Sequence, residues 1–295
     1  MARNSFLDGI KLLRIHQWVK NLLLFIPLLM SVSCIHGSMV TSSVLAFFSF
    51  SLGASACYVF NDLIDLPFDR LHIDKRRRPL ANGTVSATSG LVTSLILSSL
   101  SIAIGFFLSQ LFMLCLITYF AMTIIYTLDL KRRYLVDVFC LSAFFALRLF
   151  AGSAATGISG SNWLLGFSLL FFLSLALLKR YTELLGSSSD PSCPIPGRAY
   201  KRRDIPMIGV VGPLSGYLAV VMIIGYLNDP GQTQLFRHPQ WIWVICPMTL
   251  FWITRVWHKA AQGRMHHDPL VFLLRDPVSS GMAVLALLTI TAAQF

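Results

Sequence analysis

Nine apolar runs, separated by short polar segments, follow one another along the chain. They cover about residues 17–34, 40–61, 89–108, 111–127, 136–156, 163–178, 207–227, 241–257 and 278–292. Each approaches the roughly 20 residues that an α-helix needs to cross the hydrocarbon layer of a bilayer. The pattern predicts an all-α polytopic membrane bundle of about nine transmembrane helices, with residues 1–295 forming a single domain.

Composition agrees with this prediction and excludes several other classes. The 295 residues are 55% hydrophobic and only 13% charged, which is far from the balance of a soluble domain. The six cysteines are scattered without Cys-x-x-Cys spacing, so neither a disulfide framework nor a zinc site is expected.

The basic residues are distributed unevenly between the two sides of the predicted bundle. All Lys and Arg except Arg148 and Arg237 lie in the N-terminal segment or in segments 70–78, 131–133, 179–203 and 255–275. By the positive-inside rule these segments, and the N-terminus, are cytoplasmic. The net charge of +11 is therefore interpreted as a topology signal and a source of lipid contacts, and no nucleic-acid partner is expected.

The first 20 residues combine charged and apolar side chains at roughly helical spacing. This pattern predicts an interfacial helix leading into the first span, and it differs from that of a cleavable signal peptide.

Acidic residues concentrate at the cytoplasmic end of the second predicted span. Asp62, Asp65 and Asp69 are separated by three and four residues, so on a helix they share one face, with Asn61 one turn before Asp65. Stacked carboxylates at a membrane boundary repel one another unless a cation neutralises them, and Mg²⁺ prefers such ligands together with substrate phosphates. Pro67 is expected to kink or end the helix, which makes the position of Asp69 less certain.

A basic segment follows the acidic cluster directly. It contains Arg70, Lys75, Arg76 and Arg78, which can hold anionic substrate oxygens outside a metal shell. The alternative for the acids is an ordinary solvated helix end with salt bridges to these bases. For the bases, the alternative is a role as topology signals and anionic-lipid contacts.

At this point the residues resemble a known family. Asn61-Asp62-x-x-Asp65-x-x-x-Asp69, followed by Arg70-x-x-x-x-Lys75-Arg76-x-Arg78-Pro, looks like the first aspartate-rich motif of the UbiA prenyltransferase superfamily. The resemblance implies a membrane enzyme of about nine spans. It also implies a Mg²⁺ cofactor bound by Asp62, Asp65 and Asp69 as metal-binding catalytic residues, and a diphosphate substrate.

The second motif of that superfamily is replaced here. Many members carry Asp-x-x-x-Asp after the sixth span, whereas this chain has Lys179-Arg180-x-x-Glu183. That sequence resembles the decaprenyl-phosphate phosphoribosyltransferase branch, as do segments 17–21, 126–131, 147–152 and 268–276. The resemblance implies phosphoribosyl diphosphate (PRPP) as donor and a polyprenyl phosphate as acceptor. More basic residues suit such an anionic substrate set.

Further substrate-binding candidates come from the ends of the spans and from one intramembrane charge. Lys20, Tyr126 and Lys131 lie at cytoplasmic ends, where the lysines either contact the donor or extend to lipid headgroups. Arg148 lies three turns from Asp137 on the same helix face; it either stabilises the bundle or lines a polar cavity below the site. His266 and His267 are interpreted as loop residues.

Two cytoplasmic segments, 62–88 and 179–206, are therefore expected to form the site, and the second has the composition of a flexible cover. The primary hypothesis is Mg²⁺-assisted transfer of 5-phosphoribose from PRPP to a polyprenyl phosphate in the bacterial cytoplasmic membrane, serving the cell envelope. The alternative is transfer of an isoprenoid from its diphosphate to an aromatic or other small acceptor. A transporter or lipid-binding scaffold is disfavoured because its charges would lie deeper in the membrane. A homo-oligomer is compatible with the sequence.

Overall fold

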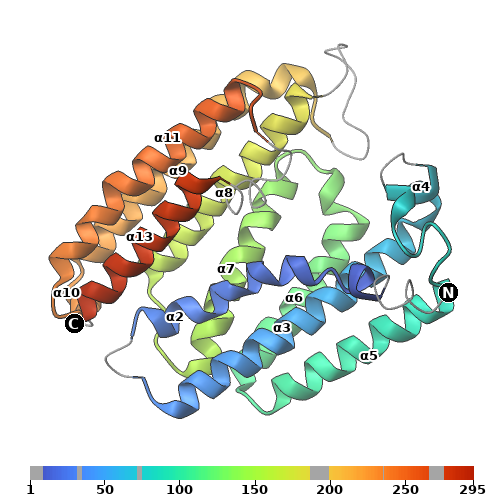
Figure 1. Cartoon of the computed structure of the whole chain (residues 1–295), viewed down its shortest axis with the longest axis horizontal. Helices are drawn as coiled ribbons and strands as arrows, with labels where there is room; N and C mark the ends of the chain where they lie inside the picture. The colour runs from blue at the N-terminus through green and yellow to red at the C-terminus, as the bar shows by residue number, and fades with distance from the viewer. Residues whose placement is uncertain (1–8, 32–34, 72–74, 187–198, 235, 266–275) are drawn as a thin grey trace. The chain divides into compact units, whose positions relative to one another are not determined.

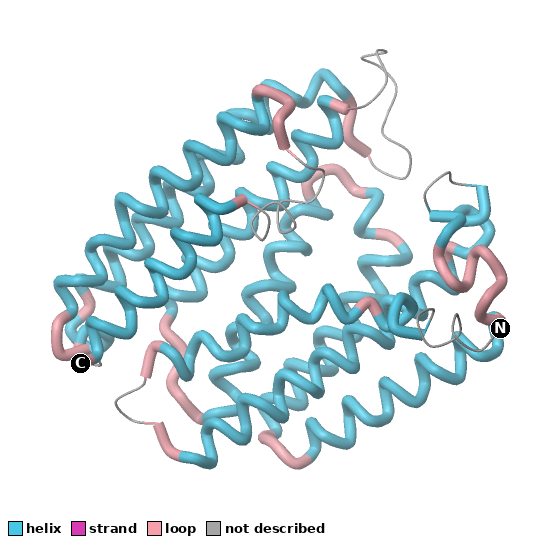
Figure 2. The backbone as a smooth tube through the Cα atoms, in the orientation of Figure 1, coloured by secondary structure: helices cyan, strands magenta, loops and turns pink. Residues whose placement is uncertain are grey.

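The computed structural model describes residues 9–31, 35–71, 75–186, 199–234, 236–265 and 276–295. Within these residues all regular elements are helical and no strand is present, as Figure 2 shows. The all-α prediction is confirmed.

Seven helices in the described residues are long and apolar enough to cross a bilayer. Two further predicted spans correspond to Ile15–Leu29, a shorter apolar helical stretch, and to the 3₁₀ helix Pro239–Val244 followed by the 17-residue α-helix Ile245–Ala261. The prediction of nine spans with a cytoplasmic N-terminus therefore stays a prediction. The principal helices, coloured along the chain in Figure 1, are η1 (Ile15–Phe25), α2 (Ile26–Leu29), α3 (Gly37–Ile64), α4 (Leu66–Leu71), α5 (Ala87–Phe106), α6 (Gln110–Leu128), α7 (Val136–Thr156), α8 (Asn162–Leu185), α9 (Ile205–Asn228), α11 (Ile245–Ala261) and α13 (Pro277–Gln294).

The chain forms two compact units. The sequence pattern, which predicted residues 1–295 as one domain, did not indicate this division. The first unit comprises residues up to 28, residues 36–127 and residues 150–158, and the second comprises the rest. In the first unit α3 packs along α5 through small residues, as is common between membrane helices. Ser49 and Ser101 each donate a hydroxyl hydrogen bond to the other's carbonyl oxygen, at 2.8 and 2.7 Å.

The N-terminal segment is not one continuous helix. Helical turns over residues 9–13 end at Arg14, whose φ of +50° is left-handed, and the 3₁₀ helix η1 begins at Ile15. Further along, η1 lies against Gly152 of α7, where an added Cβ would lie 2.2 Å from the Leu24 carbonyl oxygen. This close approach accounts for the glycine that ends the 147–152 segment noted in the sequence.

In the second unit α8 packs along α9, which also contacts α11. Gly212 of α9 admits the Trp257 ring, because an added Cβ would lie 2.1 Å from the indole. The Trp257 indole N–H donates to Ser174 Oγ of α8 at 3.0 Å and so ties the three helices together. Helix α8 is continuous to Leu185, so residues 179–185 of the segment expected to be a loop are helical.

Candidate active site

The acidic cluster of the first unit forms where α3 ends. The helix stops at Ile64, and the backbone N–H groups of Phe68 and Asp69 donate to the Asp65 carbonyl oxygen at 3.0 and 2.9 Å as α4 begins. This break before Pro67 confirms the expected helix end. The turn leaves the side chains of Asp62 and Asp69 buried, at 3% and 2% exposure.

A single guanidinium joins these two carboxylates. Arg78 Nη1 donates to Asp62 Oδ1 at 2.9 Å and to Asp69 Oδ2 at 2.5 Å. Pro67 was expected to place Asp69 less securely on the face shared with Asp62, yet the break in the helix brings Asp69 to the same Arg78 nitrogen as Asp62. Arg78 therefore contacts the acidic pair itself, and its predicted contact with substrate stays a prediction.

Two further cations contact the pair. Arg14 Nη2 donates to both oxygens of Asp62, at 2.6 and 2.8 Å, and Lys75 Nζ lies 3.9 Å from Asp69 Oδ1. The Lys75 side chain is 46% exposed, so its contact is the weaker of the two. Arg14 was not predicted, since it precedes Asp62 by 48 residues and belongs to no recognised motif.

Asp65 occupies a different position from its two neighbours. Its backbone ends α3, and its side chain, like that of Asn61, is half-buried. In the part of the chain that the structure describes, no three Asp, Glu, His or Cys side chains converge on one point as a metal cluster. A metal site of Asp62, Asp65 and Asp69 therefore stays a prediction.

The other substrate-binding candidates of the first unit differ in exposure. Arg70 and Arg76 are exposed, while Lys20 and Tyr126 are half-buried. Their proposed contacts with substrate stay predictions.

A second polar cluster, in the second unit, lies between the start of α7 and the end of α8. Arg180 Nε lies 2.9 Å from Asp137 Oδ2, and Arg180 Nη1 makes a short ion pair with Glu183. The side chains of Arg180 and Asp137 are only 1% and 0% exposed. In this structure the Arg180 charge is thus met by two carboxylates, and its predicted contact with substrate stays a prediction.

Tyr200 completes this second cluster from the segment before α9. Its hydroxyl donates a short hydrogen bond to Asp137 Oδ1 and accepts one from the Leu135 backbone N–H at 3.1 Å. Leu135 has a left-handed φ of +62°, a conformation that the Tyr200 contact helps to hold. Burial, and then the hydrogen bond to Asp137, raise the pKa of the Tyr200 hydroxyl above its ordinary value.

The remaining candidates of the second unit lie near this cluster in sequence. Lys179 and Lys131 are half-buried. Arg148 is 4% exposed; its Nη1 donates to the Phe144 carbonyl oxygen at 2.6 Å, and its guanidinium lies 5.6 Å from the Phe145 ring centre. Backbone and aromatic contacts of this kind stabilise an intramembrane charge.

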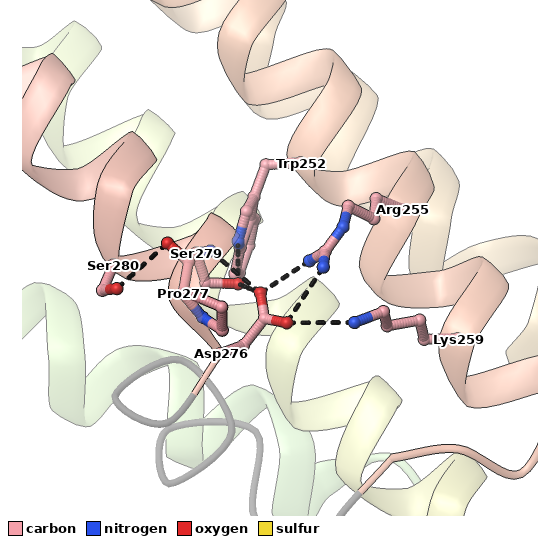
Figure 3. A network of polar contacts seen from close by, with 7 residues as sticks. All are labelled: Trp252, Arg255, Lys259, Asp276, Pro277, Ser279 and Ser280. Carbon is pink, nitrogen blue, oxygen red and sulfur yellow. Dashed lines mark hydrogen bonds and ion pairs between the residues drawn. The ribbon is translucent and has the colours of Figure 1, made fainter.

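A third cluster, shown in Figure 3, fixes the start of α13. Asp276 accepts two hydrogen bonds from Arg255, at 2.7 and 2.9 Å, and one from Lys259 at 3.0 Å. It also caps α13 through Ser279, whose hydroxyl accepts from the Trp252 indole N–H. The Arg255 hydrogen bonds hold the pKa of Asp276 well below its ordinary value. The preceding residues 268–275, and His266 and His267, lie outside the described residues.

The order and sequence of these helices match a known family. The model of the UbiA prenyltransferase family matches residues 24–186, which is more than half of the chain. The chain belongs to the UbiA prenyltransferase family.

Three curated proteins are similar to this chain. An uncharacterised protein, y4nM, of Sinorhizobium fredii is 36% identical over 92% of this chain and 53% of the relative. The nodulation protein NoeC of Azorhizobium caulinodans is 31% identical over 93% and 89%. Decaprenyl-phosphate phosphoribosyltransferase of Mycobacterium tuberculosis is 34% identical over 59% of each chain. The chain thus spans little more than half the length of the first and third.

Solved structures confirm the UbiA fold. A UbiA homologue from Archaeoglobus fulgidus bound to DMAPP and Mg²⁺ has a TM-score of 0.70 at 15% identity, with 96% of this chain and 98% of that chain covered. The same homologue is known with GPP and Mg²⁺. UbiA enzymes thus include a protein that binds a magnesium ion with a prenyl diphosphate.

The acidic pair of this UbiA chain fits a divalent cation on its own geometry. Asp62 and Asp69 are buried carboxylates that both contact one guanidinium nitrogen. Their oxygens therefore lie close enough together for a single cation to contact both. Carboxylate oxygens are the ligands that Mg²⁺ prefers. Asp62 and Asp69 thus have the donor chemistry of magnesium ligands, and the metal site of Asp62, Asp65 and Asp69 stays a prediction.

Proposed function

We propose that this UbiA-family chain transfers 5-phosphoribose from PRPP to a polyprenyl phosphate, at the cytoplasmic face of a bacterial inner membrane. The observation that carries the proposal is the charge of the second cluster. At the end of α8, where many relatives of this family have two acids, a buried Arg180 is paired with Asp137 and Glu183. Arg180 and the adjacent Lys179 together offset the two carboxylates, so this position lacks the net negative charge that two unpaired acids would present to a second metal ion, and it favours an anionic ligand.

The proposed donor divides its charge between a diphosphate and a separate 5-phosphate. Asp62 and Asp69, with Asp65 as an additional ligand, would hold a magnesium ion that stabilises the negative charge of the leaving diphosphate. Arg78 fixes the orientation of the two buried carboxylates through its shared nitrogen. Lys75, Arg70 and Arg76 are exposed beside this turn and offer cationic donors to the phosphate oxygens.

The acceptor requires little from the protein beyond its placement. The phosphate monoester of a lipid is already nucleophilic at neutral pH, so attack on ribose C1 does not require a strong general base. Lys131 and Lys179, both half-buried at helix ends, are the proposed contacts of the acceptor phosphate and the 5-phosphate. The polyprenyl tail would lie among the apolar helices.

Similarity to the mycobacterial decaprenyl-phosphate phosphoribosyltransferase supports this choice of substrates. The alternative is transfer of an isoprenoid from its diphosphate. It is favoured by the structural neighbour known with DMAPP or GPP and Mg²⁺. A similarity to digeranylgeranylglyceryl phosphate synthase of Methanosphaera stadtmanae, at 28% identity over 51% of this chain, favours it too.

Two parallel assays decide between these activities. The purified chain receives labelled PRPP with decaprenyl phosphate in one assay, and labelled geranyl diphosphate with 4-hydroxybenzoate in the other. We expect lipid-soluble label only in the first, and its loss with Asp62→Asn and with EDTA. Label incorporated only in the second assay would establish the alternative and refute phosphoribosyl transfer.

A further inference from the structure

Arg14 contacts Asp62 of the acidic pair, although it belongs to no motif recognised in the sequence. One of its nitrogens donates to both oxygens of Asp62, at 2.6 and 2.8 Å, and its guanidinium lies 5.1 Å from the Tyr58 ring centre. The Arg14 side chain keeps 20% of its surface exposed, whereas Asp62 keeps 4%. Arg14 therefore covers a buried carboxylate while remaining open to solvent on its other side.

The backbone around Arg14 is held in place from both sides. Ser55 Oγ of α3 donates to the Leu13 carbonyl oxygen at 2.7 Å and accepts from the Trp18 indole N–H at 2.9 Å. Leu12 is buried against Val59 and Leu80. Arg14 itself adopts the left-handed conformation, which costs a non-glycine residue on the order of 1 kcal/mol or more. Such a conformation persists because these contacts fix the segment, and the guanidinium is thereby positioned in advance.

Three basic side chains contact the two buried carboxylates of the cluster. Arg14, Arg78 and Lys75 surround the two carboxylates of Asp62 and Asp69. A divalent cation on those carboxylates would oppose the guanidinium of Arg14 at Asp62, since like charges repel strongly at such distances. A diphosphate arriving with the metal supplies new anionic oxygens, which are strong acceptors for an arginine.

We propose that Arg14 exchanges partners during binding of the donor. In the free protein it pairs with Asp62 and disfavours metal binding without substrate. When the metal diphosphate binds, the guanidinium leaves Asp62 for a non-bridging phosphate oxygen. This inference rests on the metal diphosphate site of the proposed function, but not on whether the donor carries ribose or an isoprenoid. Arg14 is then a donor-binding residue that couples metal binding to substrate binding.

The proposed change of partner predicts opposite effects of Arg14→Met on two affinities. This variant removes the positive charge and keeps much of the side-chain volume. Mn²⁺ alone, titrated into the full-length purified protein and followed by the EPR signal of free Mn²⁺, should bind about 3- to 10-fold more tightly because its competitor is gone. Pyrophosphate, titrated in saturating Mn²⁺, should bind about 10- to 100-fold more weakly because a charge-assisted hydrogen bond is lost.

The matched control is Arg133→Met, which removes the same charge from an exposed pair with Asp129 whose side chains are 61% and 51% exposed. Both affinities should be unchanged in this control. Arg14→Lys keeps the charge without the planar fork and should weaken pyrophosphate binding about 3- to 10-fold. This variant decides the matter if Arg14→Met does not fold.

The outcomes separate this inference from the proposed function. If Arg14→Met changes neither affinity, or weakens both equally, Arg14 has a purely structural role and the exchange is refuted. Tighter Mn²⁺ binding with unchanged pyrophosphate binding also refutes it, because Arg14 is then only a counter-ion. If the wild-type protein binds neither Mn²⁺ nor pyrophosphate, the metal diphosphate site itself is wrong.

Discussion

Removal of Arg180 should strongly destabilise the second unit. The change Arg180→Met keeps a long apolar side chain but leaves Asp137, at 0% exposure and 2.9 Å from the lost nitrogen, and Glu183 without their shared cation. Breaking a buried ion pair on one side costs about 3–5 kcal/mol, because the remaining charge is buried without compensation. We expect a loss of this size in the free energy of unfolding.

A double-mutant cycle isolates the interaction energy between Asp137 and Arg180. Asp137→Asn combined with Arg180→Met removes both charges, and we expect a coupling energy of about 2 kcal/mol or more between the two changes. Unfolding is measured by SDS titration of the purified protein in mixed micelles, followed by far-UV circular dichroism. Arg133→Met, which breaks the exposed pair with Asp129, is the control and should cost about 0–1 kcal/mol.

A cost below about 1 kcal/mol for Arg180→Met, or a coupling energy near zero, would refute the reasoning. The Arg180 side chain would then be solvated or differently paired in the membrane. The charge argument for the proposed donor would lose its basis with it.

Three further predictions concern stability, each measured by thermal unfolding of the purified protein. The pKa of Asp276 is depressed in the folded protein, so the stability that this carboxylate provides is complete above its ordinary pKa of 3.8 and is lost as the pH falls below it. Asp276→Asn should therefore make the thermal stability of the protein fall less steeply between about pH 5 and 3. The pKa of Tyr200 is raised in the folded protein, so the stability that its hydroxyl provides is complete below its ordinary pKa of 10.0 and is lost as the pH rises above it. Tyr200→Phe should lose less stability at alkaline pH than the wild type, and an equally steep loss in the variant would contradict this account. Gly152→Ala should cost about 1–3 kcal/mol because its Cβ meets the Leu24 carbonyl, whereas Gly281→Ala, with open space around it, should be neutral or stabilising.

The sequence predicted the helical fold well, because apolar runs of membrane length have few alternatives in a bilayer. The end of α3 was predicted for a sound reason, since Pro67 cannot continue the helix. The spacing rule for Asp62, Asp65 and Asp69 was less successful. It placed the three acids on one helix face, with Asp69 less secure because of Pro67, whereas in the structure Asp69 reaches Asp62 through a turn and a shared Arg78.

The partners of buried charges could not be predicted from local spacing. Helical periodicity related Asp137 to Arg148 within α7, whereas the structure pairs Asp137 with Arg180 of α8 and with Tyr200. Arg14 was missed because its position depends on a left-handed residue and on contacts with α3, none of which is encoded in a motif. The sequence offered one signal for Arg14. It lies shortly before Gln17-Trp18, which begin a segment that resembles the family.

The central claim is that the Asp62–Asp69 cluster binds the magnesium diphosphate of a sugar phosphate. The most direct measurement is calorimetric titration of the purified protein with PRPP and with geranyl diphosphate, each with and without Mg²⁺. We predict Mg²⁺-dependent binding of PRPP at least about 10-fold tighter than that of geranyl diphosphate, and its loss in Asp62→Asn. Tighter binding of geranyl diphosphate, or PRPP binding that survives Asp62→Asn and chelation of Mg²⁺, would contradict the account.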